Sequence, residues 1–182
     1  QSEPSAIAVR NDSPLKTMGD FVAAVRASPD TMSVGGFSTA GFHQYVLFRL
    51  QEIAGFKAVW VPFKGGQDAT VALLGGHIQA ALITPSTALS QYRAGEIRLL
   101  GVSTGERNEY MPDVPTFKEQ GYDFSDSLWR GLMVKAGTPK PILDSLLAAI
   151  AEMRKSRDWK EFSRINMQSN VEFSLDEMNK KV

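Results

Sequence analysis

Small polar residues and glycines gather in three short segments of the chain, each placed between an apolar run and a stretch with helical apolar spacing. The segments are Gly36-Phe37-Ser38-Thr39, Lys64-Gly65-Gly66 and Thr84-Pro85-Ser86. Each is expected to join the end of a strand to the start of a helix. A helix start exposes backbone N–H groups that attract anions, and glycine lets a ligand approach the backbone closely. The three segments therefore predict a site for a small anion, in which Lys64 is either a contact or an ordinary solvated lysine.

Ser38 is the residue of these segments that resembles a nucleophile. The run Gly36-Phe37-Ser38-Thr39-Ala40 differs by one residue from the G-x-S-x-G turn of serine hydrolases. A hydrolase also needs a histidine to activate the serine and an acid to orient that histidine. The two histidines are poorly placed for this, because His43 lies on the helix after Ser38 and His77 is expected at the opposite edge of the sheet. We expect Ser38 to cap that helix and donate its hydroxyl, with an esterase using Ser38 as the alternative.

Other kinds of site leave no pattern in the composition or the motifs. The 182 residues include no cysteine, and 20 Lys and Arg balance 20 Asp and Glu. This excludes thiolate chemistry and gives no electrostatic footprint for nucleic acid. The glycine pairs form neither a dinucleotide fingerprint nor a phosphate loop, and no His and carboxylate group has metal-ligand spacing. We expect no cofactor, no metal, no catalytic residue and no nucleic-acid partner.

Strand and helix patterns alternate along the first 136 residues. A capping box of Thr17 and Asp20 begins one helix. The apolar, β-branched run 59–63 predicts a buried strand, and the pair Gly75-Gly76 ends the helix that follows it. The alternation predicts an α/β fold with a mainly parallel sheet and flanking helices. Because the carboxyl ends of parallel strands share one edge, the three polar segments are expected to lie together there.

The pattern changes toward the C-terminus. The run 127–135 predicts an apolar strand that contains Trp129, and beyond it apolar residues repeat at helical spacing. We divide the chain into an α/β lobe, 1–136, and C-terminal helices, 137–182. A third helix is predicted to begin at Ser174. The apolar faces of the first two C-terminal helices are formed by Ile142, Leu143, Leu146, Leu147 and Ile150 and by Trp159, Phe162 and Ile165.

Several motifs stand in the order found in the solute-binding proteins of tripartite tricarboxylate transporters, also called the Bordetella uptake gene family, and the chain resembles that family over nearly its whole length. The most specific is the Pro-Asp-Val-Pro-Thr-x-x-Glu-x-Gly run. The motifs are Val61-Pro62-Phe63-Lys64-Gly65-Gly66, Leu74-Gly75-Gly76-His77-Ile78, Ala94-Gly95-Glu96-Ile97-Arg98, Arg107, Pro112-Asp113-Val114-Pro115-Thr116-Phe117-Lys118-Glu119-Gln120-Gly121 and Gly131-Leu132-Met133-Val134-Lys135-Ala136-Gly137-Thr138-Pro139.

The resemblance implies a two-lobed periplasmic receptor of the type II periplasmic-binding-protein-like fold. Such a receptor closes on a small organic anion, typically a carboxylate, and delivers it to membrane permease subunits. The chain would be the second lobe, flanked by crossover strands 5–10 and 127–134, with the first lobe missing. By position, the resemblance places the substrate contacts at Gly36, Phe37, Ser38, Thr39, Lys64, Gly65, Gly66, Thr84, Pro85 and Ser86.

Two departures from the family pattern affect this expected site. The segment around Ser38 is shifted by about one residue against the common Gly-x-Gly-Ser pattern, so either hydroxyl of Ser38 and Thr39 is a candidate donor. Phe63 stands where tyrosine is usual, which removes one phenolic hydroxyl from the site region.

The C-terminal helices are expected to pack on the first lobe in a whole receptor. Without it, their apolar faces predict dimerisation through residues 139–182, since a contiguous exposed apolar patch usually marks an interface. Two alternatives to transport remain beside the esterase. A ligand-sensing domain of a transcription regulator has a similar fold but needs an attached pair of DNA-binding helices, and a structural fragment would bind no ligand.

Overall fold

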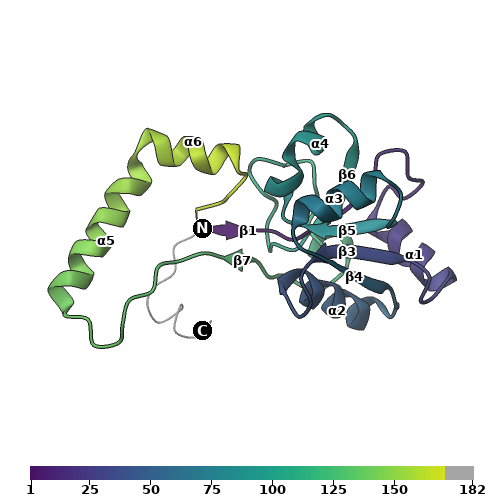
Figure 1. The fold of residues 1–182 in the computed structure, drawn as a ribbon, viewed down its shortest axis with the longest axis horizontal. Coiled ribbons are helices and arrows are strands. Elements are labelled where there is room, and N and C mark those ends of the chain that lie inside the picture. The colour runs from purple at the N-terminus through teal and green to yellow at the C-terminus, as the bar shows by residue number, and fades with distance from the viewer. Residues whose placement is uncertain (171–182) are drawn as a thin grey trace.

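The computed structural model describes residues 1–170, and the helix predicted from Ser174 lies outside them. The chain forms an α/β lobe, from which two helices extend as an arm (Figure 1). In chain order, the elements are β1 (Ser2–Glu3), β2 (Ala6–Arg10), α1 (Met18–Ala27), β3 (Ser33–Phe37), α2 (Phe42–Ala54), β4 (Val59–Phe63), α3 (Gly66–Leu74), β5 (Ala80–Ile83), the 3-10 helix η1 (Pro85–Ala88), α4 (Leu89–Arg93), β6 (Ile97–Val102), the 3-10 helix η2 (Lys118–Gln120), β7 (Leu128–Trp129), α5 (Lys140–Lys155) and α6 (Arg157–Ile165).

The lobe is built on a five-stranded sheet in the order β4-β3-β5-β2-β6. β3 is parallel to both β4 and β5, whereas β2 is antiparallel to both β5 and β6. Four strands therefore point one way and β2 points the other, so the α/β class is confirmed and the sheet is mixed, with two parallel and two antiparallel pairings. β2 is reversed because the chain enters the lobe at the edge where the other four strands end.

The run 59–63 forms a strand, but the prediction that this strand is buried was wrong. β4 is the edge strand of the sheet, and 42% of the surface of Val59 is exposed. A β-branched, aromatic run is found both in central strands and in edge strands, and the pairing with other strands decides which of the two it becomes. Pro62 is also exposed and has no N–H to offer a further strand, which protects the edge.

Apolar side chains fill both faces of the sheet. α1 and α2 pack on one face and α3 and η1 on the other. Successive side chains of a strand point to opposite faces of the sheet. In β2, Ile7 and Val9 lie on the first face and Ala6 and Ala8 lie on the second.

The helix ends follow their sequence signals. In the capping box of α1, the Asp20 N–H donates to Thr17 Oγ1 (3.1 Å) and the Thr17 N–H donates to Asp20 Oδ2 (2.9 Å). The Lys16 N–H donates to the same carboxylate, and this bond, followed by those from Thr17, lowers the pKa of Asp20. Gly55 ends α2 in the left-handed conformation, with φ of 59°.

Two crossover segments connect the lobe to the arm. β1, which has no signal in the sequence, pairs antiparallel with β7. The strand predicted over 127–135 is wrong beyond residue 129, and the side chains of Leu132 and Met133 are about four-fifths exposed, at 80% and 82%. Among the described residues, β7 has one pairing partner, the two-residue β1, and this limits its length.

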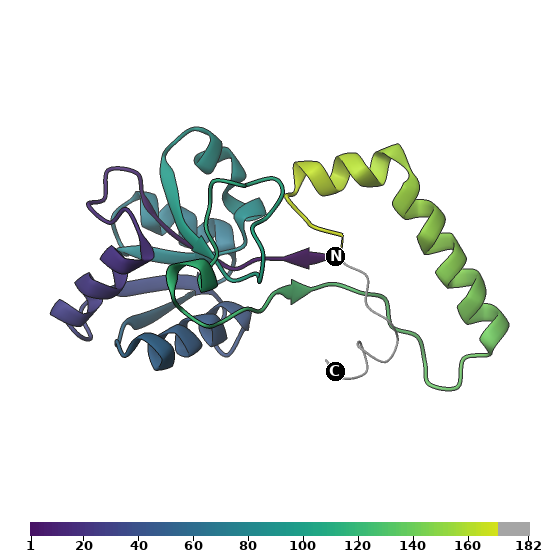
Figure 2. The ribbon, with the colours of Figure 1, turned by 180° about the vertical axis from the view of Figure 1, so that it is seen from behind.

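A buried carboxylate joins the crossover segments to the chain after α6. Glu3 is 1% exposed, accepts from Arg130 Nη2 at 2.9 Å and also accepts from Gln168 Nε2. Ser2 and Ser169 exchange backbone hydrogen bonds beside it. The two crossover segments and the returning chain thus run together between lobe and arm (Figure 2).

The arm contains the two predicted C-terminal helices. Ile142 and Leu147 of α5 are about half exposed, and so are Phe162 and Ile165 of α6. The division at residue 136 remains a prediction. Within residues 1–170, no helix has the length and apolar character needed to cross a bilayer.

Candidate anion-binding site

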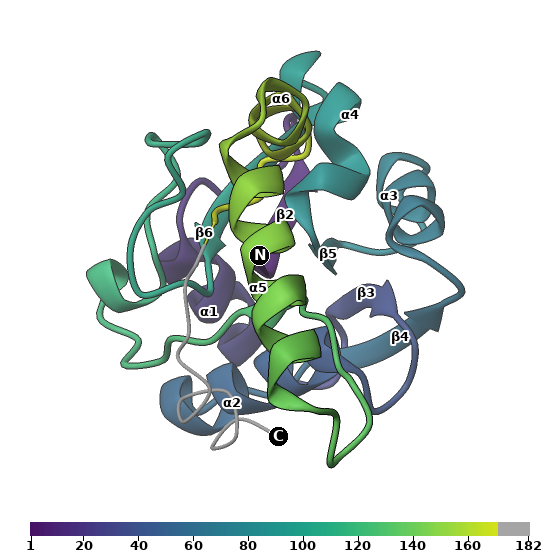
Figure 3. The same ribbon diagram turned by 90° about the vertical axis from the view of Figure 1, so that its left-hand side faces the viewer.

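The three polar segments lie together at one edge of the sheet, as predicted. Phe37 pairs with Phe63 and Gly36 with Leu82, so β3, β4 and β5 end at nearly the same level. Figure 3 views the molecule from the arm side, where the ends of these strands are neighbours. The Ser38 N–H donates to the Phe63 carbonyl (2.9 Å), and a Cβ on Gly66 would lie 2.6 Å from Thr87 Oγ1. The first turn is therefore bonded to the end of β4, and the second turn lies against Thr87, just after the third.

Helices α2 and α3 begin at this edge without side-chain caps. Their N-cap residues are Gly41 and Gly65, and neither helix has a side-chain hydrogen bond at its cap. The prediction that Ser38 caps α2 was wrong, because Ser38 stands three residues earlier, at φ of 64°, and its hydroxyl donates to the Thr39 carbonyl (3.1 Å). The first backbone N–H groups of an uncapped helix lack intrahelical acceptors, so they are available to an anion.

The ten residues expected at the site differ in solvent exposure. Phe37, Thr39 and Lys64 are exposed, while Ser38, Gly65, Gly66 and Ser86 are partly exposed. The remaining three, Gly36, Thr84 and Pro85, are buried.

Gly36 has a packing role that the sequence did not reveal. It lies inside β3, and a Cβ there would be 2.3 Å from the indole of Trp60 and 2.8 Å from the Leu82 carbonyl. The absence of a side chain at Gly36 therefore makes room for Trp60. Close approach of a ligand is not needed to explain it.

Lys64 is the positive charge that directly precedes an uncapped helix, α3. It directly precedes Gly65, the N-cap of α3, and its side chain is exposed. Among the salt bridges of residues 1–170, none involves Lys64, whose ammonium group is therefore free to meet an anion.

His43 is a buried residue of this region that sequence reasoning placed on α2 without assigning it partners. Its Nδ1 lies 2.7 Å from Ser5 Oγ and its Nε2 lies 3.4 Å from Thr84 Oγ1. Burial lowers the pKa of His43 to about 4, so the imidazole is neutral at pH 7. Its spacing of three and four residues from Val46 and Leu47 places it on the buried face of α2, a signal that the sequence did contain.

These contacts separate His43 from Ser38. Both ring nitrogens of His43 face other hydroxyls, and the Ser38 hydroxyl is bonded to its own turn. His77 precedes β5 and is exposed at the opposite edge of the sheet. Among the described residues, Ser38 thus has no histidine as a general base, and nothing in this geometry favours the esterase.

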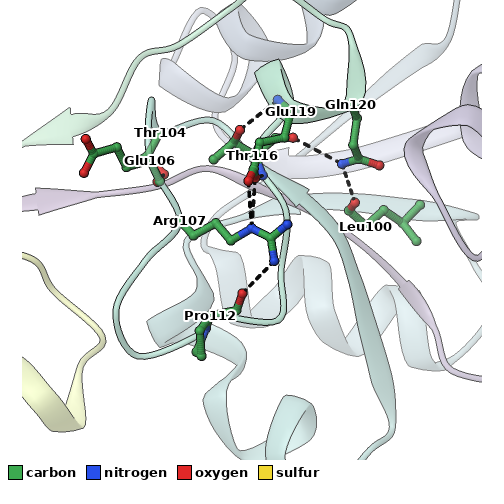
Figure 4. Close-up of polar contacts among 8 residues, drawn as sticks. All are labelled: Leu100, Thr104, Glu106, Arg107, Pro112, Thr116, Glu119 and Gln120. Atoms are coloured by element: carbon green, nitrogen blue, oxygen red, sulfur yellow. Dashed lines mark hydrogen bonds and ion pairs between the residues drawn. The ribbon is translucent and has the colours of Figure 1, made fainter.

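The proline-rich motif holds the long loop after β6 (Figure 4). Arg107 Nε lies 3.0 Å from both oxygens of Glu119, and Arg107 Nη1 donates to the Pro112 carbonyl (2.9 Å). Thr116 and Glu119 form a reciprocal cap, with N–H to side-chain bonds of 2.7 and 3.0 Å. The Thr116 N–H, then Arg107, lower the pKa of Glu119.

The motif also bonds to β6, where Gln120 Nε2 donates to the Leu100 carbonyl (3.0 Å) and the Phe117 N–H donates to the Val102 carbonyl (2.9 Å). Its contacts fasten the loop to the sheet, which indicates a structural role.

The donors at the sheet edge suit an anion better than a cation. Within residues 1–170, no group of three His, Asp or Glu side chains is placed to hold a metal ion. What gathers at the edge is backbone N–H groups, hydroxyls and Lys64.

An α/β sheet with polar turns at one edge, and with crossover segments running side by side, is the construction of one lobe of a periplasmic-binding-protein-like fold. The chain belongs to the tripartite tricarboxylate transporter family of receptors, whose family profile matches residues 1–180. The family indicated by the motifs is thereby confirmed.

Relatives with known sequences support this membership. A UPF0065 protein of Agrobacterium vitis, from the TAR-I ttuE-ttuC' intergenic region, is 34% identical over 148 residues, which cover 81% of this chain and 43% of that protein. Protein BugT of Bordetella pertussis is 29% identical over 145 residues, covering 79% of this chain and 44% of BugT. The chain thus spans less than half the length of these relatives.

Solved structures show the same architecture. A TctC solute-binding protein from Polaromonas, without ligand, has a TM-score of 0.79 and 31% identity over 91% of this chain and 57% of its own. MatC from Rhodopseudomonas palustris, with bound malate, has a TM-score of 0.77 and 25% identity over 91% of this chain and 57% of its own. R. palustris Rpa4515 with adipate, at 22% identity, a TM-score of 0.86 and coverage of 99% and 60%, shows the fold alone.

Proposed function

We propose that this chain is the second lobe of a periplasmic receptor that captures a small organic carboxylate for a tripartite transporter. The observation that carries the proposal is the meeting of two uncapped helix N-termini, those of α2 and α3, at one sheet edge beside Lys64. Malate is bound in the solved structure of MatC.

The carboxylate would be held by donors from all three turns. The first N–H groups of α2 and α3 would bond its oxygens, since charge-assisted hydrogen bonds are the stronger kind. The hydroxyls of Ser86 and Thr84 would add directional contacts from the third turn, and Lys64 would add a positive charge. Phe37, half exposed at the end of β3, would offer an apolar surface to the body of the solute.

A first lobe would supply the opposite wall. Closure of two lobes excludes water and strengthens each hydrogen bond to the solute. The exposed apolar face of α5 would pack on that lobe, and the closed receptor would present the solute to membrane permease subunits.

The test is a thermal-shift panel on the full-length protein, with malate, adipate and benzoate as carboxylates. Glucose 6-phosphate and putrescine serve as a phosphate and a cation of comparable size. We expect at least one carboxylate to raise the melting temperature, because a ligand that binds only the native state stabilises it. A shift with the phosphate or the amine and with none of the carboxylates would refute the proposal.

A further inference from the structure

A chain of buried polar side chains leads from the first crossover segment to the third turn of the site. Ser5, in the link between β1 and β2, is 0% exposed, His43 is 6% exposed and Thr84 is 7% exposed. Ser5 Oγ lies 2.7 Å from His43 Nδ1, and His43 Nε2 lies 3.4 Å from Thr84 Oγ1. Polar groups at this depth cost free energy unless they are paired, so the direction of each hydrogen bond matters.

Among the described residues, either direction of the first bond leaves one hydroxyl hydrogen without an acceptor, that of Ser5 or that of Thr84, and the 0% exposed Ser5 is the costlier place for it. Ser103 Oγ accepts the Ser5 N–H (2.9 Å) and gives its own hydrogen to the Asp126 carbonyl (2.7 Å). Within residues 1–170, His43 is the one hydrogen-bond partner of the Ser5 hydroxyl. With the Ser5 hydrogen pointing to His43 Nδ1, this nitrogen is the unprotonated one.

The second bond then follows from the neutral state of the ring. Burial lowers the pKa of His43 to about 4, so at pH 7 the imidazole carries one hydrogen. With Nδ1 accepting from Ser5, that hydrogen is on Nε2 and points to Thr84 Oγ1. Thr84 accepts this bond, and the described chain holds no acceptor for the hydrogen of its hydroxyl.

We infer that His43 is a positioning residue of the anion site. Because its ring donates to Thr84 Oγ1, the hydrogen of the Thr84 hydroxyl is left to point toward the bound carboxylate. The inference rests on the function proposed above. It assigns a role to a histidine that lies out of reach of Ser38, and it connects the site to the crossover segment through Ser5.

The first test reads the tautomer directly. Nitrogen-15 NMR of the histidine rings of the full-length protein at pH 7, without solute, distinguishes protonation at Nε2 from protonation at Nδ1. His43→Gln, which lacks this ring, assigns the signals of His43 by their disappearance. We expect the Nε2–H tautomer for His43. A ring protonated at Nδ1 would overturn the inference, whether or not any solute binds.

The second test is a double-mutant cycle in solute affinity, measured by calorimetry with malate and adipate on His43→Phe, Thr84→Val and the double variant. We expect each single change to weaken binding roughly tenfold, as loss of a hydrogen bond to a charged group does. The double variant should bind no more weakly than Thr84→Val, because His43 acts through Thr84. Losses that add independently would contradict this.

Two further variants guard against a trivial result. Thr84→Ser keeps the hydroxyl and should retain most of the affinity. If His43→Phe does not fold, His43→Gln tests the same coupling with a shorter polar group. Failure of the wild-type protein to bind any carboxylate would refute the proposed function, and with it this role. Carboxylate binding that is unchanged by Thr84→Val would refute this inference alone.

Discussion

The indole of Trp60 lies over Gly36 and donates from Nε1 to the Ser38 carbonyl at 3.1 Å. The ring thus crosses from the edge strand β4 to β3 and fastens the first turn of the candidate site. Both contacts require that residue 36 have no side chain, since a Cβ would lie 2.3 Å from the ring.

Gly36→Ala should therefore lower the free energy of unfolding by about 1–3 kcal/mol, the usual cost of overpacking. Gly105→Ala is the matched control, because the Cβ that it would add meets no atom closer than 3.7 Å. Chemical denaturation of both variants measures the difference. Equal stability of the two would contradict the packing role of Gly36.

The stability of the protein should fall as the pH drops from about 6.5 toward 4. The pKa of His43 is lowered from 6.5 in the unfolded chain to about 4 in the folded one. As the pH falls, the unfolded state therefore binds the proton first, and stability that is present above pH 6.5 is lost between pH 6.5 and 4. The free energy of unfolding should fall by about 3 kcal/mol over this range.

A pH series of urea denaturation isolates this effect as the difference between the wild-type protein and His43→Phe. Carboxylates whose pKa is lowered, such as those of Asp20 and Glu119, titrate alike in both proteins and cancel. The exposed His77 supplies the control, since His77→Phe should keep the full slope. A slope unchanged by His43→Phe would show that His43 is not the group responsible.

Lys64→Gln should weaken carboxylate binding by about threefold to tenfold, through loss of one charge beside the uncapped helices. The loss should shrink as salt is added, because the ammonium group is exposed and its charge is screened. Lys57→Gln removes another exposed lysine, at the opposite edge of the sheet, and should leave affinity unchanged. Calorimetry at low and high salt measures both, and equal affinities at low salt would assign Lys64 to the solvated surface.

The 182-residue chain on its own should form dimers through the arm, because the apolar face of α5 is exposed. Leu147→Glu places a charge on that face and should shift the chain to monomers. Ser145→Glu adds the same charge away from the apolar residues and should not. Size-exclusion chromatography with light scattering measures the mass, and a monomeric wild-type chain would disprove the prediction.

Thr116→Ala should lower the free energy of unfolding by about 1 kcal/mol, the typical cost of losing a helix cap. Thr116 Oγ1 accepts the Glu119 N–H in the loop after β6. Solute affinity should stay the same, because the loop bonds to itself, to β6 and to α1, and not to the three polar turns. Glu106→Ala, on the exposed part of the same loop, is the control. A loss of affinity in Thr116→Ala with unchanged stability would give the motif a role in binding instead.

Much of the lobe was predictable because its signals are local. The capping box at Thr17, the glycine at residue 55 and the alternation of strand and helix each depend on neighbours within a few residues, and the structure confirms them. The strand predicted over 127–135 failed for the opposite reason. Its apolar residues have the right types, but a strand also needs a partner, and β1 supplies one for only two residues.

The sequence by itself determined the α/β class, the family and the three polar turns, since periodicity, caps and motifs are written in consecutive residues. Tertiary structure alone decided that β4 is the sheet edge, that β2 is reversed and that Gly36 serves Trp60. It also brought His43 to Ser5 and Thr84, which are 38 and 41 residues away in the chain. Contacts between such distant residues depend on how the strands pair and how the helices cover them, and local sequence patterns do not predict that pairing and packing.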